Sequence, residues 1–179
     1  MMVPRLRPYL ERDGDCLLDW MEDEVSLAKW CGGYFRYPLT AGQLLAYQAD
    51  YSLRPDRLLL TAADETGAPL GHMMFKDIDY EENSVHLGHI IIDPSLRNQG
   101  MGKQMLRLSL RYAFWILGLS KATLTVFHNN PRACRCYGAV GFRELRTYQS
   151  LFPFHDERWS FSMLLLERDR FDGASISND

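Results

Sequence analysis

The sequence contains no apolar run long enough to cross a lipid bilayer. Its longest apolar stretch, residues 113–119, is much shorter than the ~20 residues that a membrane-spanning helix needs. Arg5 and Arg7 near the N-terminus are not followed by an apolar segment, so the sequence predicts no secretion signal. We therefore expect a cytoplasmic protein with no membrane partner.

Cysteine is scarce, and its spacing fits neither a disulfide framework nor a metal site. The chain has four cysteines, namely Cys16, Cys31, Cys134 and Cys136. No two of them form a C-x-x-C pair, and no histidine lies at zinc-finger spacing from one of them. The sequence therefore predicts free thiols and no bound metal.

The chain also lacks an excess of positive charge. It has 20 Lys and Arg against 23 Asp and Glu, a formal net charge of −3. A protein that binds nucleic acid through its backbone phosphates is normally strongly basic, so we expect no nucleic-acid partner. The composition is that of an ordinary globular protein, with 46% hydrophobic and 24% charged residues. A length of 179 residues without repeats or low-complexity linkers fits one domain.

The first third of the chain reads as mainly helical. A short strand is expected at 3–8, where Pro4 confines it to the edge of a sheet. Residues 13–30 mix apolar and acidic side chains in a pattern typical of one or two helices. Thr40 and Gln43 then form a capping box, which predicts a helix reaching to about residue 53.

From residue 58 the pattern changes to short apolar strands separated by polar turns. Three consecutive strands of this kind predict an antiparallel meander, at 58–63, 70–77 and 85–92. A helix is expected at 101–117 and a strand at 121–128. Because a strand, a helix and another strand form a crossover unit, the strands 85–92 and 121–128 should be parallel neighbours. A capped helix follows from Asn130 and Pro131 to Gly141, and the final strands are expected at 142–149 and 159–166.

The turn at 97–103 contains the most informative motif. It joins an apolar strand to a long helix, where unpaired backbone N–H groups and the helix dipole attract anions. Gly100 and Gly102 would let a phosphate approach the backbone, because neither has a Cβ. The alternative is that both glycines merely tighten the turn.

Two common phosphate motifs do not fit this turn. A nucleoside-triphosphate loop needs a glycine where Arg97 stands and a hydroxyl where Gln104 stands. A dinucleotide-binding loop needs a third glycine, and Met105 occupies that position. Both types of nucleotide site are therefore excluded on the motif.

A second motif, combined with the first, resembles a known family. Segment 97–102 is similar to the [QR]-x-x-G-x-[GA] pyrophosphate loop of the GNAT superfamily of acetyl-CoA-dependent N-acetyltransferases. Segment 130–142 resembles the N-x-x-A-x-x-x-Y-x-x-x-G-F helix and strand of the same superfamily. The resemblance is clearest over 58–142. The N-terminal part, with Asp15, Trp20 and Trp30 followed by Pro38-Leu39-Thr40, is similar to the branch that acetylates the N-termini of ribosomal proteins. That branch also includes enzymes that act on small amines and antibiotics.

The resemblance implies an α+β fold with a mixed, mostly antiparallel central sheet, flanked by helices and containing a splayed parallel strand pair. It implies a single acetyltransferase domain over 1–170, followed by a flexible tail at 171–179. Within the domain it implies acceptor-side helices at 1–56, an acetyl-CoA-binding core at 57–142 and C-terminal strands at 143–170.

The resemblance also implies an enzyme that moves an acetyl group from acetyl-CoA directly to a primary amine. The acceptor would be a protein N-terminus or a small-molecule amine, and acetyl-CoA would serve as co-substrate without a metal. Dimers are common in the family, so the resemblance allows a homodimer, although the sequence does not fix the oligomeric state. The alternative is a non-catalytic module on the same fold that binds or senses acyl-CoA.

The residues implied to hold the cofactor lie on the third strand, the glycine turn and the second motif. They are Ile90, Ile91, Ile92, Arg97, Asn98, Gln99, Gly100, Met101, Gly102, Lys103, Asn130 and Ala133. In the family the strand pairs with the pantetheine arm, and the loop N–H groups bind the pyrophosphate. Asn130 has a second role here, since it also caps a helix.

Two catalytic residues follow from the resemblance. Tyr137 occupies the position whose phenol hydrogen-bonds the CoA sulfur, although aromatic packing on the sheet is the alternative. Many members place a glutamate base fourteen residues before the first loop glycine, and here that position is His86. Because an imidazole titrates near neutrality, His86 is the candidate base, with His89 and His72 as competing candidates. The alternative for each of them is a hydrogen-bonded histidine of the core or surface without a catalytic role.

Overall fold

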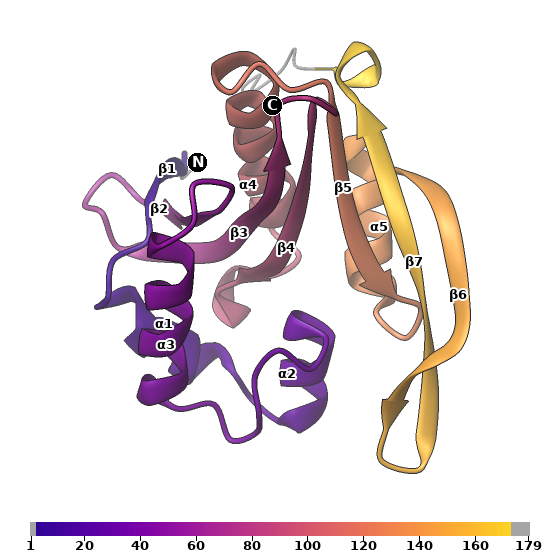
Figure 1. The fold of residues 1–179 in the computed structure, drawn as a ribbon. Helices are drawn as coiled ribbons and strands as arrows, with labels where there is room; N and C mark the ends of the chain where they lie inside the picture. The colour runs from indigo at the N-terminus through magenta and orange to yellow at the C-terminus, as the bar shows by residue number, and fades with distance from the viewer. Residues whose placement is uncertain (1–2, 173–179) are drawn as a thin grey trace.

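One seven-stranded sheet organises the protein (Figure 1). The computed structural model describes residues 3–172, and over this range the strand order is β1-β2-β3-β4-β5-β7-β6. The strands are β1 (Arg5–Pro8), β2 (Leu58–Ala63), β3 (Pro69–Asp79), β4 (Ser84–Ile92), β5 (Lys121–Phe127), β6 (Arg143–Phe154) and β7 (Glu157–Glu167). Neighbouring strands are antiparallel except β4 and β5, which are parallel. The predicted fold class, the meander and the parallel pair are confirmed.

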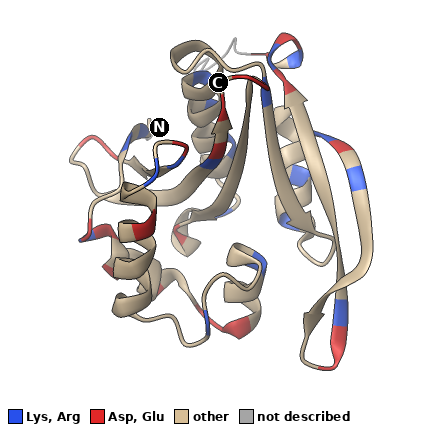
Figure 2. Cartoon of the chain, viewed as in Figure 1, with Lys and Arg blue, Asp and Glu red and all other residues tan. Residues whose placement is uncertain are grey.

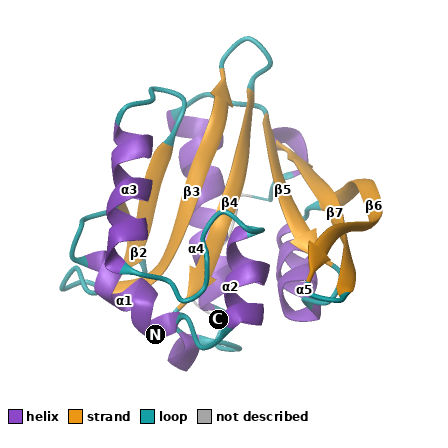
Figure 3. Ribbon diagram, turned by 60° about the horizontal axis from the view of Figure 1, so that its bottom comes forward, coloured by secondary structure: helices purple, strands orange, loops and turns teal. Residues whose placement is uncertain are grey.

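Helices cover both faces of this sheet (Figure 3). They are α1 (Asp13–Trp20), α2 (Glu24–Cys31), α3 (Ala41–Ser52), α4 (Met101–Arg111) and α5 (Pro131–Val140). α1 to α3 share a core with Met74 and Ile91 on one face. α4 and α5 share a larger core with Met73 and Leu87 on the other face.

The expected helical segment at 13–30 is two helices. Asp23 begins the second one, because its carboxylate accepts a hydrogen bond from the Ser26 N–H at 2.6 Å. The predicted capping box at α3 is half correct. Thr40 Oγ1 accepts from the Gln43 N–H, but the Gln43 side chain bonds the backbone of Arg36 and Pro38 instead of reaching back to Thr40 N–H.

The helix expected at 101–117 changes its winding before it ends. Its α-helical part stops at Arg111, and Tyr112–Ile116 form a π-helical turn in which the Leu117 N–H bonds the Tyr112 carbonyl at 3.0 Å. Gly118 then ends the segment with a φ of 73°. The predicted terminus is therefore right, while the π turn was not foreseen.

The expected tail at 171–179 begins with a buried residue. Phe171 is 7% exposed and packs on the rings of Phe114 and Trp115, so this part of the expectation is wrong. Residues 173–179 lie outside the described range. Across residues 3–172, none of the helices is long and apolar enough to span a membrane.

Candidate active site

The parallel strands β4 and β5 separate partway along their length. They pair only from Ser84–Lys121 to Leu87–Leu124, and beyond this point they diverge (Figure 1). The diverging segments line a cavity of about 1040 Å³, to which β4 contributes residues 87–92 and β5 contributes Thr125 and Val126. Backbone N–H and C=O groups that leave a ladder need other partners, so this gap can hold an extended polar ligand.

The N-terminus of α4 forms one end of this cavity. Gly100 is its N-cap residue with a φ of 82°, which favours glycine, and no side chain caps the helix. A Cβ at Gly100 would meet no atom within 4 Å, so open space lies before it. Gly100, Gly102 and Lys103 all line the cavity. Exposed N–H groups and open space fit the diphosphate of a coenzyme.

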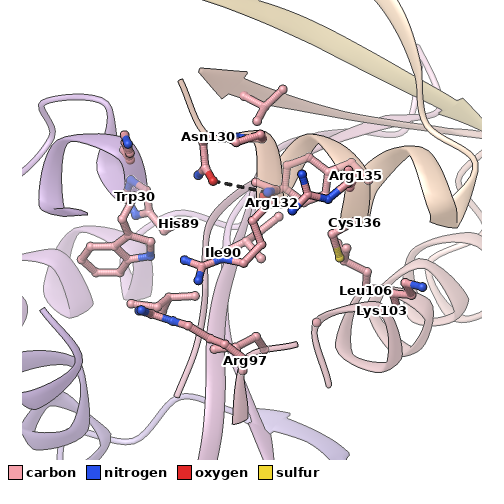
Figure 4. A pocket seen from close by; sticks show the side chains of 18 of the residues that line it. Trp30, His89, Ile90, Arg97, Lys103, Leu106, Asn130, Arg132, Arg135 and Cys136 are labelled. Atoms are coloured by element: carbon pink, nitrogen blue, oxygen red, sulfur yellow. Dashed lines mark hydrogen bonds between the residues drawn. The ribbon is translucent and has the colours of Figure 1, made fainter. Parts of the chain in front are cut away.

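Most of the residues expected to hold the cofactor meet at this cavity. Those that line it are Ile90, Ile91, Ile92, Arg97, Asn98, Gly100, Gly102, Lys103, Asn130 and Ala133. Gln99 and Met101 are outside the lining. The Gln99 amide donates to the Ser95 carbonyl at 2.8 Å, and Met101 is buried in the core. Asn130 Oδ1 accepts from the Ala133 N–H at 3.3 Å, so its amide group caps α5 from the cavity wall (Figure 4).

The cavity wall is strongly cationic. Its charged residues are the cations Lys29, Arg97, Lys103, Arg132 and Arg135, and the single described carboxylate Glu22. Figure 2 shows Lys and Arg on α5 beside the gap, and Figure 4 shows four of these cations around the cavity. Arg132 and Arg135 were not identified from the sequence, although they lie one helical turn apart behind the cap Asn130. A wall of this charge suits a polyanionic ligand.

Tyr137 is buried in the wall of the cavity, on α5. Burial raises the pKa of its phenol, helped by the neighbouring Cys136 and Cys134. The phenol therefore stays protonated and can donate a hydrogen bond to a ligand. Among the described residues, none forms a hydrogen bond with the Tyr137 hydroxyl.

His86 lies outside the cavity. Its Nδ1 lies 3.0 Å from the Thr123 hydroxyl on β5, within the stretch where the two strands still pair. Burial lowers its pKa to about 4, so the ring is neutral at pH 7. His86 adjoins the lining residues Leu87 and Gly88 but does not itself line the cavity, and its assignment as the base remains a sequence prediction.

His89 does line the cavity, at a bulge in β4. β4 advances one residue more than β3 between the pairs His72–Ile91 and Met74–Gly88, and His89 has a φ of 47°. Its Nδ1 lies 3.0 Å from the Tyr47 hydroxyl on α3, and the same hydroxyl lies 3.2 Å from His72 Nε2. Burial lowers the pKa of both His72 and His89 to about 3, so both rings are neutral.

The end of α1, the α1–α2 connection and α2 form the other end of the cavity. The lining residues of these segments are Trp20, Met21, Glu22, Ser26, Lys29 and Trp30. The indole Nε1 of Trp30 is buried and has no hydrogen-bond partner among the described residues. The sequence pattern showed these helices but not that they cover the diverging strands, since that contact joins distant parts of the chain.

The described residues contain no set of ligands for a metal ion. Over residues 3–172, no three or more His, Cys, Asp and Glu side chains are grouped so that they could hold a metal ion. The four cysteines are free thiols in the structure.

Comparison with known families gives a match over most of the chain. The model described as the acetyltransferase (GNAT) family matches residues 17–142. This range includes α2, the whole cavity lining on β4, α4 and α5, and the predicted Tyr137.

Solved structures with the same fold include spermidine N-acetyltransferase from Vibrio cholerae. Its complex with CoA and spermine has a TM-score of 0.81 and 18% identity, covering 94% of this chain and 97% of that one. A chimera of this enzyme with hSSAT has a TM-score of 0.80 and 19% identity, covering 93% and 96%. A dodecameric structure of the Vibrio cholerae enzyme in an intermediate state has a TM-score of 0.75 and 20% identity, covering 93% and 95%. At these identities the likeness concerns the fold.

Proposed function

The chain belongs to the GNAT acetyltransferase family, and on that premise we propose that it acetylates a small, singly charged primary amine. As an acetyl-CoA-dependent N-acyltransferase it uses acetyl-CoA as co-substrate. The observation that carries the proposal is the continuous cavity from the N-terminus of α4, through the β4–β5 gap, to Tyr137 and the α1–α2 connection.

The cavity offers a different partner to each part of the co-substrate. The N–H groups at Gly100 and Gly102 face the diphosphate, with Arg97 and Lys103 adding positive charge. The backbone of β4 from Ile90 to Ile92 pairs with the pantetheine arm in place of the β5 strand that has diverged. In this arrangement the thioester lies near Tyr137.

The chemical step needs no covalent enzyme intermediate. The acceptor's ammonium group first loses one proton to water, because a protonated nitrogen has no lone pair. The neutral nitrogen then forms a bond to the thioester carbon while the carbonyl electron pair moves to oxygen. The carbonyl then re-forms, the carbon–sulfur bond breaks and its electron pair leaves with sulfur. Tyr137 donates a hydrogen bond from its phenol to that sulfur, and the second proton lost by the acceptor nitrogen also goes to water. Since burial raises the pKa of Tyr137, a hydrogen bond is its role rather than full proton transfer.

The charge of the wall favours an acceptor with one amine over a polyamine. Several cations line the cavity, whereas its one described carboxylate, Glu22, already pairs with Arg97 at 3.2 Å. A polycation would meet repulsion from Lys29 and no free carboxylate among the described lining residues. The resemblance of the N-terminal part to the ribosomal-protein branch keeps a protein N-terminus as the second acceptor class.

Thiol release from acetyl-CoA across a panel of amines tests the proposal. The panel contains aliphatic monoamines, short peptides with free N-termini, and spermidine. Turnover with monoamines supports the proposal, and a preference for peptides or spermidine would replace the acceptor class. Tight binding of CoA without thiol release from any acceptor would support the alternative, a non-catalytic acyl-CoA-binding module.

A further inference from the structure

Three buried side chains form a chain of hydrogen bonds that ends at the cavity. The Tyr47 hydroxyl on α3 lies between His72 Nε2, at 3.2 Å, and His89 Nδ1, at 3.0 Å. Tyr47 and His72 are almost completely enclosed, at 1% exposure each, while His89 lines the cavity. The chain therefore has one closed end, at His72, and one end that reaches the cavity.

The closed end fixes the direction of the hydrogen bonds. His72 Nδ1 is buried without a partner among the described residues, and a neutral imidazole carries one N–H and one lone pair. A buried N–H without a partner is rarer in proteins than a buried acceptor without one. The proton of His72 therefore lies on Nε2 and is donated to the Tyr47 oxygen.

The position of the His72 proton determines the positions of the Tyr47 and His89 protons. Tyr47 has a single hydroxyl hydrogen, so it donates to His89 Nδ1. His89 Nδ1 must then be the unprotonated nitrogen, and its proton lies on Nε2. His89 Nε2 has no hydrogen-bond partner among the described residues and is not enclosed by other atoms. It is therefore open to the cavity that His89 lines. The network thus presents an uncharged N–H donor to whatever the cavity holds.

A second unsatisfied donor lies beside it. The rings of Trp30 and His89 have centroids 5.4 Å apart, and Trp30 Nε1 is buried without a partner among the described residues. Of these two neutral N–H donors, Trp30 Nε1 is enclosed, whereas His89 Nε2 is open to the cavity. The bulge at His89 lies just beyond Leu87, the last residue that pairs with β5, where the gap opens.

We propose that His89 is a catalytic residue that donates its Nε2–H to the carbonyl oxygen of the thioester, and that Tyr47 and His72 are positioning residues that hold its tautomer. This inference rests on the proposed function. As the acceptor amine attacks, the carbonyl electron pair moves to oxygen, and the His89 N–H stabilises that negative charge. Because burial keeps the His89 pKa at about 3, the ring keeps its role as a neutral donor across the physiological range.

The first experiment removes the His89 imidazole by substitution and then adds free imidazole to the variant. His89→Gly suits the φ of 47° at this position and leaves a hole of the size of the ring. We expect kcat to fall by about 10²-fold, as for loss of one oxyanion donor. Added imidazole should restore activity, whereas 1-methylimidazole, which has no N–H, should not. Rescue by both compounds would overturn the donor role in favour of a base, and full activity without rescue would remove His89 from the chemistry.

Two controls separate this inference from the proposed function. If wild-type protein releases no thiol with any amine, the proposed function fails. If the wild-type protein turns over and His89→Gly has the same kcat, only the inference fails. His128→Gln removes a histidine that lies outside the cavity lining and bonds the Ser162 hydroxyl at 2.8 Å. The His128→Gln variant should keep the wild-type kcat, and added imidazole should not change its activity.

The tautomer can be observed without any substitution at His89. In nitrogen-15 spectra of the wild-type protein, the His89 proton should reside on Nε2, and a proton on Nδ1 would overturn the inference even if a variant failed to fold. Tyr47→Phe removes the hydrogen bond to Nδ1, so both tautomers should then appear. We expect the kcat of this variant to be about tenfold lower, while its KM for acetyl-CoA stays near the wild-type value. A fall in kcat without a change in KM indicates that an interaction with the transition state was lost.

Discussion

The Glu22 carboxylate lies 3.2 Å from the Arg97 guanidinium, so the connection between α1 and α2 is tied to the loop before α4. Both residues line the cavity. The pair brings together two segments that are 75 residues apart in the sequence. It also places a negative charge next to a cation that faces the expected site of an anionic coenzyme, and this leads to the first prediction.

Glu22→Gln should strengthen binding of CoA. The substitution frees Arg97 and removes a carboxylate that repels the coenzyme phosphates. Since partly exposed ion pairs contribute ~0.2–1 kcal/mol, we expect the Kd to fall by no more than about fivefold. Calorimetric titration at low and high salt measures it, and the gain should shrink as salt screens the charges. An unchanged or higher Kd would show that Arg97 does not face the coenzyme.

Gly100→Val should weaken CoA binding by at least tenfold, because a branched side chain would fill the open space before α4 and force a strained φ. Gly118→Val is the matched control, since Gly118 also has a positive φ and open surroundings but lies away from the cavity lining. Titration of both folded variants with CoA separates backbone strain from a blocked site. Equal Kd values for the two variants would contradict the assignment of the loop.

Tyr137→Phe should lower kcat by about 10²-fold and leave the Kd of CoA almost unchanged, since the hydroxyl acts on the departing sulfur. The ring itself packs against Phe142, and phenylalanine keeps that contact. Thiol release and CoA titration on the same sample give the two quantities. Wild-type turnover in this variant would leave Tyr137 with a packing role alone.

Stability should decrease as the pH falls below about 6.5. Burial lowers the pKa of His72 and His89 to about 3 and that of His86 to about 4, so between these values and 6.5 the unfolded chain binds more protons than the folded one. Each such group lowers the free energy of unfolding by up to ~1.4 kcal/mol per pH unit in that window. Urea unfolding at pH 7 and pH 5 measures the loss. The His72→Gln variant should lose less stability between pH 7 and pH 5 than the wild-type protein. Equal stability of the wild-type protein at both pH values would contradict the burial of these rings in their neutral form.

Local patterns were sufficient to predict most of the elements. The strand Leu58–Ala63 and the α5 caps Asn130 and Gly141 have the expected bounds, because a short apolar run and capping chemistry are encoded within a few residues. The π turn at Tyr112–Ile116 was missed. Its altered hydrogen bonding leaves Ala113 and Phe114 buried, which the sequence pattern does not distinguish from an α-helix.

The site was harder to predict because of a single bulge. In a regular strand Leu87 and Ile91 would point to the same face, yet Leu87 packs with α4 and α5 while Ile91 packs with α1 to α3. The extra residue turns His89 toward Tyr47 and the cavity. Counting from the glycine loop instead selected His86, since a bulge leaves no signal in one sequence. Tyr47 was missed for a similar reason, as it lies 42 residues before its partner His89.

The position of α2 determines how the acceptor entrance of such a site can change. Ala28 packs with Phe127 and Trp159 on the β5–β7 side, and Trp30 belongs to the core on the β3–β4 side. Glu24 adds an exposed contact with His155 at 3.0 Å. One short helix therefore acts as a spacer between the two arms of the split sheet. Altering its length or its apolar residues would widen or narrow the entrance for the acceptor while leaving every group that grips the coenzyme untouched.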